Sequence, residues 1–194
     1  MKLTIHAVCA DNVTLIGLIE RLWIAPENAE WKPKTDVLSL SDVKRWMDSD
    51  DIEVLGFTDA MIHDGRFRIE PPLPVVDYVR WIKHYFARCF RENPDGEWSD
   101  SSYSAGWELV RVFIELWDNQ VVPRELVLEL KVWIAGLYKN ADDRLRTCIV
   151  NATLEHLFER KPIRKYFSDW RKDPILAIAY NQACFWDRKT PLSR

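Results

Sequence analysis

His156 is the first residue of the chain to weigh for chemistry, because an imidazole can act as a general base near neutral pH. At 100° per residue, its side chain falls in line with Leu145, Ile149 and Ala152 on the apolar side of an expected helix. A hydrolase or nuclease that uses His156 with a nearby carboxylate is one hypothesis. However, a histidine on an apolar face is more often a core residue, and no serine or cysteine is tied to it by a recognisable signature. We therefore expect a core histidine and no catalytic residue.

The sequence contains no motif typical of a metal site or a nucleotide-binding site. The four histidines fall in different expected elements and show neither HxxxH nor HExxH spacing. The four cysteines form no CxxC pair, and the six glycines are spread singly, so neither a phosphate loop nor a dinucleotide fingerprint can be placed. We therefore expect no metal site and no cofactor.

Charge is distributed unevenly along the chain, although the formal net charge is only −3. Residues 1–70 carry 8 Lys/Arg against 13 Asp/Glu, whereas residues 141–194 carry 11 against 7. The acidic side chains that we consider as a contact surface are Asp48, Asp50, Asp51, Glu53, Asp59 and Asp64. Complementary charge raises the rate and selectivity of association, so this surface would suit a basic protein partner.

A basic cluster near the C-terminus offers a further alternative, a regulatory nucleic-acid-binding protein. The cluster comprises Arg160, Lys161, Arg164, Lys165, Arg171 and Lys172, and it brackets the aromatic residues Tyr166, Phe167 and Trp170. Such residues bind phosphates and stack on bases. A basic cluster is more often a solvated helix surface, and an acidic protein, or the acidic N-terminal part of this chain, would fit it equally well. Because the whole chain is mildly acidic, nucleic acid is not the partner that we expect.

Residues 1–70 are predicted to form a small antiparallel β-sheet with one helix. Residues 2–9 alternate in strand period, and residues 13–24 fit a strand or a helix, of which we favour the returning strand. Residues 52–62 and 66–69 flank an Asp-Gly pair, the strongest short hairpin signal in the chain.

The one helix of this region is expected to be short. Ser39 or Ser41 should cap it, and it should run through Met47. Its expected inward residues are Val43, Trp46 and Met47.

Residues 71–194 are predicted to form a helical bundle of about six helices, which makes the chain an α+β protein. Three prolines within residues 71–74 mark the boundary, and the apolar period beyond them is helical. The expected helices cover residues 75–91, 102–118, a stretch from Pro123 through Lys139, 142–159, a short stretch after Pro162, and 174–186. Gly106 lies in the apolar arc of its helix, where a missing side chain would let another backbone come close.

Composition indicates a soluble globular protein, with 47% hydrophobic and 29% charged residues in 194. No apolar run approaches the ~20 residues that a membrane-spanning helix needs, and the N-terminus lacks the pattern of a signal peptide. We expect a cytoplasmic protein with no membrane partner.

Two pairs of motifs carry a resemblance to a known family. The first pair is NPDGEWSD at residues 93–100 with SAGW at 104–107, and the second is TLEHLFE at 153–159 with FSDW at 167–170 and DPIL at 173–176. Over about residues 71–187, the chain resembles an uncharacterised family of bacterial helical proteins, a domain-of-unknown-function group. Members are often encoded beside polymorphic or contact-dependent toxins, where they are suspected immunity factors. The family has no established catalytic residues, so the resemblance implies none here.

The resemblance implies a non-enzymatic protein-binding factor that acts as an immunity protein. Such a protein binds a cognate bacterial toxin and neutralises it by occluding the active site or locking the conformation of the toxin. Many toxic nucleases are basic, and the acidic residues of the first region would complement their charge. The enzyme that uses His156 and the nucleic-acid-binding protein that uses residues 160–172 remain the alternatives.

Overall fold

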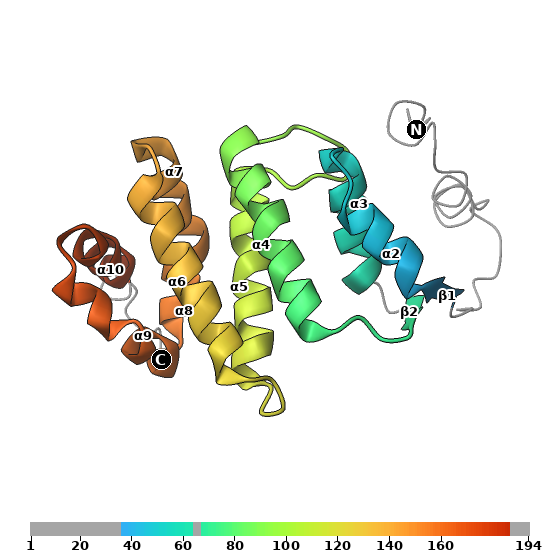
Figure 1. The fold of residues 1–194 in the computed structure, drawn as a ribbon. Helices are drawn as coiled ribbons and strands as arrows, with labels where there is room; N and C mark the ends of the chain where they lie inside the picture. Colours follow the sequence, from blue (N-terminus) through green and yellow to red (C-terminus); the bar gives the residue numbers. More distant parts are fainter. Residues whose placement is uncertain (1–35, 64–66, 187–194) are drawn as a thin grey trace, which may run out of the picture. The chain divides into compact units, whose positions relative to one another are not determined.

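The computed structural model describes residues 36–63 and 67–186 (Figure 1). The strands expected at residues 2–9 and 13–24, and the acidic residue Asp64, lie outside these ranges. The chain forms two compact units, the first made of residues 1–73 with 97–99 and the second of residues 74–96 with 100–194.

Two short strands and two helices make up the described part of the first unit (Figure 1). Strand β1 (Asp36–Ser39) pairs in parallel with β2 (Phe67–Glu70), first residue opposite first and last opposite last. Helices α2 (Leu40–Met47) and α3 (Ile52–His63) connect the two strands. The predicted antiparallel sheet is therefore wrong, because parallel strands need a crossover connection and these helices provide it.

Helix α2 confirms its prediction, whereas α3 replaces a predicted strand. The Ser39 hydroxyl accepts a hydrogen bond from the Ser41 amide at the start of α2, and the three expected residues of α2 are buried. In α3, every residue from Val54 to Asp59 is buried. A continuous apolar run suits a buried strand and a buried helix equally, and its twelve-residue length is typical of a helix.

The second unit is helical, as predicted. Its elements are α4 (Val75–Glu92), α5 (Ser102–Asp118), α6 (Arg124–Asn140), α7 (Asp143–Cys148), the π-helical segment η2 (Ile149–Leu154), α8 (Glu155–Glu159), α9 (Lys161–Tyr166), the 3₁₀ segment η3 (Ser168–Lys172) and α10 (Pro174–Trp186). None of the helices within the described residues is long and apolar enough to cross a membrane.

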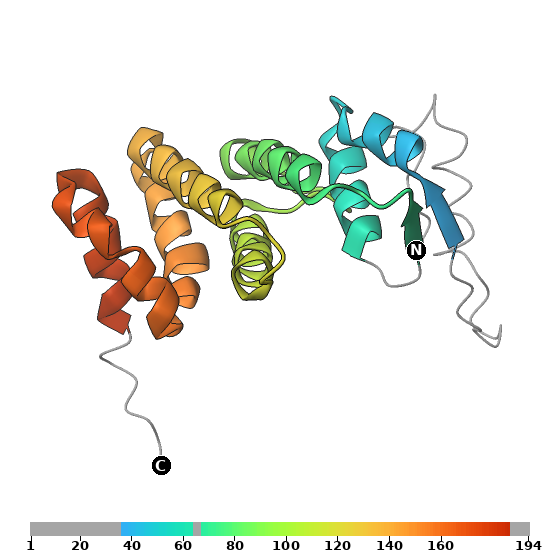
Figure 2. The same cartoon turned by 60° about the horizontal axis from the view of Figure 1, so that its bottom comes forward.

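The helices of the second unit lie in two layers. Helix α4 packs on α5 and on α6, while α5 packs on α6 and on η2. Figure 2 shows α4 and α6 in one layer, with α5 and the α7–η2–α8 segment in the other. Aromatic side chains fill the space between the helices, and Tyr85, Phe90, Phe113 and Phe158 are among those fully buried.

Gly106 lets η2 lie very close to α5, as its place in the apolar arc predicted. A Cβ atom on Gly106 would lie only 2.5 Å from the Cβ of Ala152. The neighbouring Thr153 hydroxyl donates a hydrogen bond of 3.2 Å to the carbonyl of Gly106, so the contact also satisfies a buried polar group. Only glycine allows this approach of the two backbones.

We expect Gly106→Ala to lower the free energy of unfolding by about 1–3 kcal/mol, because the added methyl group overpacks the contact. Gly136→Ala in α6 is the matched control, since a Cβ there would meet no atom within 4 Å. That change should stabilise the chain by about 0.5–1 kcal/mol through helix propensity. Urea unfolding of both variants measures the difference.

Ala152→Gly tests whether the cost arises at this contact. The double variant Gly106→Ala with Ala152→Gly should lose less stability than the two single changes added together. Additive losses would show that Gly106 is not held by the contact with Ala152.

Candidate functional site

An open groove lies on the second unit between α5 and α8. Its volume is about 480 Å³, and its lining residues are Trp107, Val110, Ile114, His156, Glu159 and Arg160. Helix α5 supplies the apolar half of the lining, and α8 with the residue that follows it supplies the polar half.

The apolar wall is a second hydrophobic stripe on α5. Tyr103, Trp107, Val110 and Ile114 are spaced by four, three and four residues, so they share one helix face. This face is distinct from the buried one that carries Leu109 and its neighbours. The side chains of Tyr103 and Trp107 are 43% and 55% exposed, which leaves two large aromatic rings facing solvent.

His156 faces the groove, so the prediction of a core histidine is wrong. The imidazole is 44% exposed, and its Nδ1 lies 3.1 Å from Oε1 of Glu159. The cause is η2, because a π turn holds one residue more than an α turn. An added residue rotates everything after it by about 100° around the helix axis. Leu157 and Phe158 are therefore buried in α8, and His156 turns outward.

The polar wall is held by ion pairs. The Nη1 atom of Arg160 donates to both carboxylate oxygens of Asp118, at 3.0 and 2.8 Å, which ties the end of α8 to the end of α5. Glu159 is 72% exposed and pairs with His156. One turn earlier, Oε1 of Glu155 is buried and has no hydrogen-bond partner among the described residues. Burial raises the pKa of Glu155; His156 opposes this shift and the charge of Glu159 adds to it.

The groove combines a histidine–carboxylate pair with an exposed aromatic wall. His156 and Glu159 have the arrangement of a base and the carboxylate that orients it. The lining residues within the described ranges include no serine, threonine or cysteine, so the nucleophile of such a base would be water. The same ranges hold no group of three or more His, Cys, Asp or Glu placed to hold a metal ion. Exposed aromatic residues beside charged ones are typical of protein-binding surfaces.

The chain matches no protein-family model, no curated protein and no solved structure in comparisons with known proteins.

The acidic residues of the first region are not brought together as one exposed surface. Asp48 and Asp50 are exposed, and Asp51 caps α3 by accepting the Glu53 amide at 2.9 Å. Asp59 differs from the expectation, because it is only 5% exposed and its Oδ1 lies 3.4 Å from Nε2 of His63. A carboxylate that is enclosed in this way is unavailable to a partner.

Glu53 serves the fold of the first unit. Its carboxylate accepts hydrogen bonds from the amides of Glu97, Trp98 and Ser99, at 2.9, 2.9 and 3.1 Å, and from the Ser99 hydroxyl. Gly56, one turn later, leaves the room for this segment, since a Cβ there would lie 2.3 Å from the Trp98 carbonyl oxygen. Glu53 thus anchors residues 97–99 on α3.

The aromatic residues of the basic cluster belong to the core. Phe167 and Trp170 are buried, at 0% and 3% exposure, and cannot stack on a base without unfolding. Tyr166 is half-buried, with the ammonium group of Lys131 positioned 4.5 Å from its ring centre. The lysines and arginines around these rings form a surface that lacks the stacking platform of a single-strand binder.

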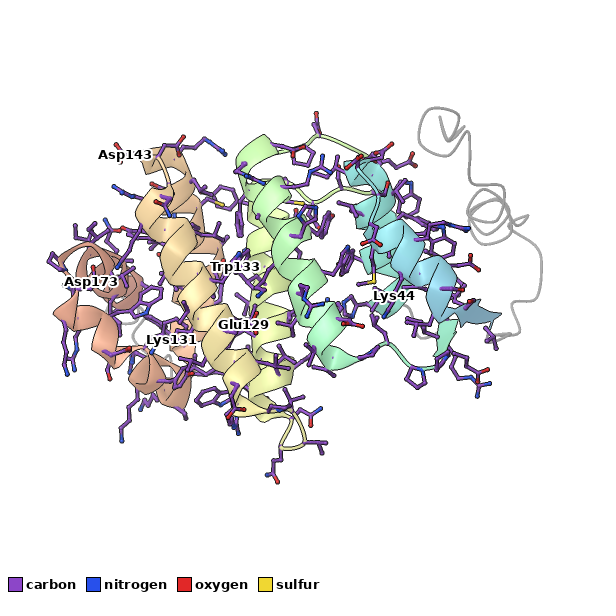
Figure 3. All side chains as sticks on the ribbon, viewed as in Figure 1. Lys44, Glu129, Lys131, Trp133, Asp143 and Asp173 are labelled. Carbon is purple, nitrogen blue, oxygen red and sulfur yellow. The ribbon has the colours of Figure 1, made fainter. Side chains whose placement is uncertain are left out.

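Lys131 is a buried cation that the sequence analysis did not single out. Its side chain is 7% exposed, and Nζ donates to the Tyr166 carbonyl at 2.7 Å and to Oδ1 of Asp169 at 2.6 Å. Figure 3 shows Lys131 on α6, and these bonds attach α6 to α9 and η3. A lysine within the predominantly apolar stretch 126–137 was the available signal.

The exposed wall of α5 was also missed. The 4-3-4 spacing of Tyr103, Trp107, Val110 and Ile114 is visible in the sequence. Helix α5 is apolar around most of its circumference, however, and such a helix is usually buried on all sides. Which of two apolar stripes faces solvent depends on how the neighbouring helices pack.

We expect Glu53→Gln to lower the free energy of unfolding by about 1–2 kcal/mol at pH 7, since a neutral amide replaces a charged acceptor. Burial raises the pKa of Glu53, but hydrogen bonds from Ser99, Trp98 and Glu97 outweigh it, so the pKa lies below its ordinary value of 4.5. A lowered pKa stabilises the fold fully above the unfolded value, and this contribution is lost as the pH falls through the folded value.

The pH dependence of urea unfolding checks this expectation. Below about pH 4.5, the wild-type chain should lose more stability than Glu53→Gln. Glu97→Gln, an exposed change in the same segment, should keep the wild-type profile. A Glu53→Gln profile parallel to wild type would contradict the anchoring role.

Lys131→Met should lower the free energy of unfolding by about 1–3 kcal/mol, because the carbonyl of Tyr166 loses its buried donor. Lys139→Met is the matched control on the same helix. Its ammonium pairs with Asp173 and its side chain is 40% exposed, so the loss should be smaller. Thermal and urea unfolding compare the two, and an equal or greater stability of Lys131→Met would contradict the assignment.

Proposed function

We propose that this chain is a non-enzymatic protein-binding factor whose contact surface is the groove between α5 and α8. The observation that carries the proposal is Trp107, a tryptophan 55% exposed at the edge of a groove. Tryptophan, tyrosine and arginine are the residue types that contribute most to protein–protein affinity.

The surroundings of Trp107 support this function. Tyr103, Val110 and Ile114 extend the apolar wall along α5, so that a partner can bury a continuous surface. Arg160, paired with Asp118, lies at the polar edge and can exclude water around the apolar centre. An apolar centre with a polar rim is the usual anatomy of a specific protein interface.

We further propose that the partner is a bacterial toxin and the chain its immunity protein. The motifs SAGW and TLEHLFE support this part of the proposal through their resemblance to suspected immunity factors. Trp107 is the last residue of SAGW and His156 lies in TLEHLFE, so the resemblance and the groove involve the same part of the chain. Binding would neutralise the toxin by covering its active site, and the exposed Asp48 and Asp50 remain candidates for a secondary contact with a basic toxin.

A hydrolase or nuclease that uses His156 is the second candidate function. The observation that favours it is the opening of the imidazole onto the groove beside the Glu159 carboxylate. The two functions differ in which residue matters most. An enzyme would lose its turnover with His156→Ala, whereas a binding factor would lose its complex with Trp107→Ala.

The partner to test is the protein encoded by the gene immediately upstream, here called the neighbouring protein. We expect Trp107→Ala to raise the dissociation constant of its complex with this chain by about 30-fold or more, the scale of an interfacial hot spot. Leu128→Ala on α6 is the matched control, since Leu128 is 50% exposed and lies outside the groove. It should change the constant less than about 3-fold. Calorimetry with the two purified proteins measures both constants.

Growth assays complete this test. Co-expression of the wild-type chain should restore growth to cells that make the neighbouring protein, and Trp107→Ala should restore it less well. Absence of a complex would overturn the immunity proposal, and equal losses for Trp107→Ala and Leu128→Ala would overturn the groove as its surface.

A further inference from the structure

We infer that the groove recognises a partner segment that carries a lysine or arginine beside an apolar anchor. The inference rests on the proposed function and deepens it, because it names the chemistry of the partner's contacting residues. The anchor would lie on Val110 and Ile114, and the cation would lie between Glu159 and the ring of Trp107.

Of the two oppositely charged residues that line the groove, Arg160 and Glu159, only Arg160 has a strong ion-pair partner. Arg160 is neutralised by Asp118, to which it donates two hydrogen bonds. Glu159 has only an imidazole as its ion-pair partner within the described residues, and it is 72% exposed. Glu159 is therefore an exposed carboxylate next to an apolar wall, and a solvent-facing imidazole is its one charged neighbour among the described ion pairs. A cation from the partner would complete the pairing.

Glu155 lies behind Glu159, outside the lining of the groove, and adds to the negative charge of this helix face. It precedes Glu159 by four residues, so the two carboxylates share one face of α8. Its Oε1 is buried and lacks a hydrogen-bond partner among the described residues. Like charges one turn apart repel each other, and an approaching ammonium or guanidinium group would relieve that repulsion.

Trp107 adds an aromatic face to the same place. A tryptophan ring attracts a cation within about 6 Å of its centre through its quadrupole. The chain already uses this interaction elsewhere, with the guanidinium of Arg124 positioned 5.3 Å from the ring centre of Trp117. Trp107 and Glu159 line the same groove, so its surface offers a cation both a carboxylate and an aromatic face.

Two synthetic helical peptides test the inference on the full-length chain. Both have about 18 residues, or five turns, and present leucines at positions i, i+3 and i+7. Residues beside the leucine face are lysines in one peptide and glutamates in the other. Calorimetry at low salt measures their dissociation constants for the wild-type chain and two charge variants.

We expect the lysine peptide to bind the wild-type chain at least about 10-fold more tightly than the glutamate peptide. Glu159→Lys should abolish or reverse this preference. Glu125→Lys, the same charge change at an exposed position of α6 outside the groove, should leave it within about 3-fold of wild type. The preference should also weaken as salt is added.

Three results would overturn the inference. They are equal affinity for the two peptides, equal effects of Glu159→Lys and Glu125→Lys, and absence of binding of either peptide at ~1 mM. The proposed function fails differently, through loss of the complex with the neighbouring protein or through an unaffected Trp107→Ala. A chain that binds that protein through Trp107 but shows no charge preference would retain the function and lose this inference.

Discussion

The second unit depends on the close contact between Gly106 and η2. With no side chain at Gly106, the backbone of α5 comes near enough for Ala152 to fill the gap and for Thr153 to donate a hydrogen bond across it. This contact sets how far apart α5 and the α7–η2–α8 segment lie. The groove exists because α8 continues from that segment along α5, which brings His156 and Glu159 into one groove with Trp107. A tight contact in the core thus determines the width of a feature on the surface.

Element ends were predictable because they are set by local chemistry. Ser39 caps α2, Asp142 accepts the Leu145 amide, and Asp173 accepts the amides of Ile175 and Leu176 at the start of α10. The features that were predicted wrongly are those that depend on tertiary packing. The run at residues 52–62 reads equally as strand or helix until its neighbours are known. The extra residue of η2 leaves no mark in the apolar period, so His156 was placed on the wrong face.

Polar residues of the chain divide into those that hold the fold and those that face outward, and their type does not reveal which is which. Glu53 appeared to be a surface charge and proves to anchor backbone amides. Lys131 had no predicted role, and its ammonium group is buried between α6 and η3. A side chain's role follows from the groups within hydrogen-bonding distance, and these come from residues 35 or more positions away. The apolar wall of α5 could not be predicted for a related reason, since Tyr103 and Trp107 are exposed because no helix of the described residues covers them.

The π-helical segment also has a consequence for how the gene can evolve. One additional residue separates this helix from an uninterrupted α-helix, and one residue corresponds to one codon. A related gene shorter by one codon within residues 149–154 would encode nearly the same amino acids. In its product, however, helix α8 would expose a different set of side chains to solvent. Divergence of the binding face could therefore arise from an insertion or deletion in the core rather than from substitutions on the surface. Relatives should then be aligned with a gap allowed inside this helix, although gaps are normally placed in loops.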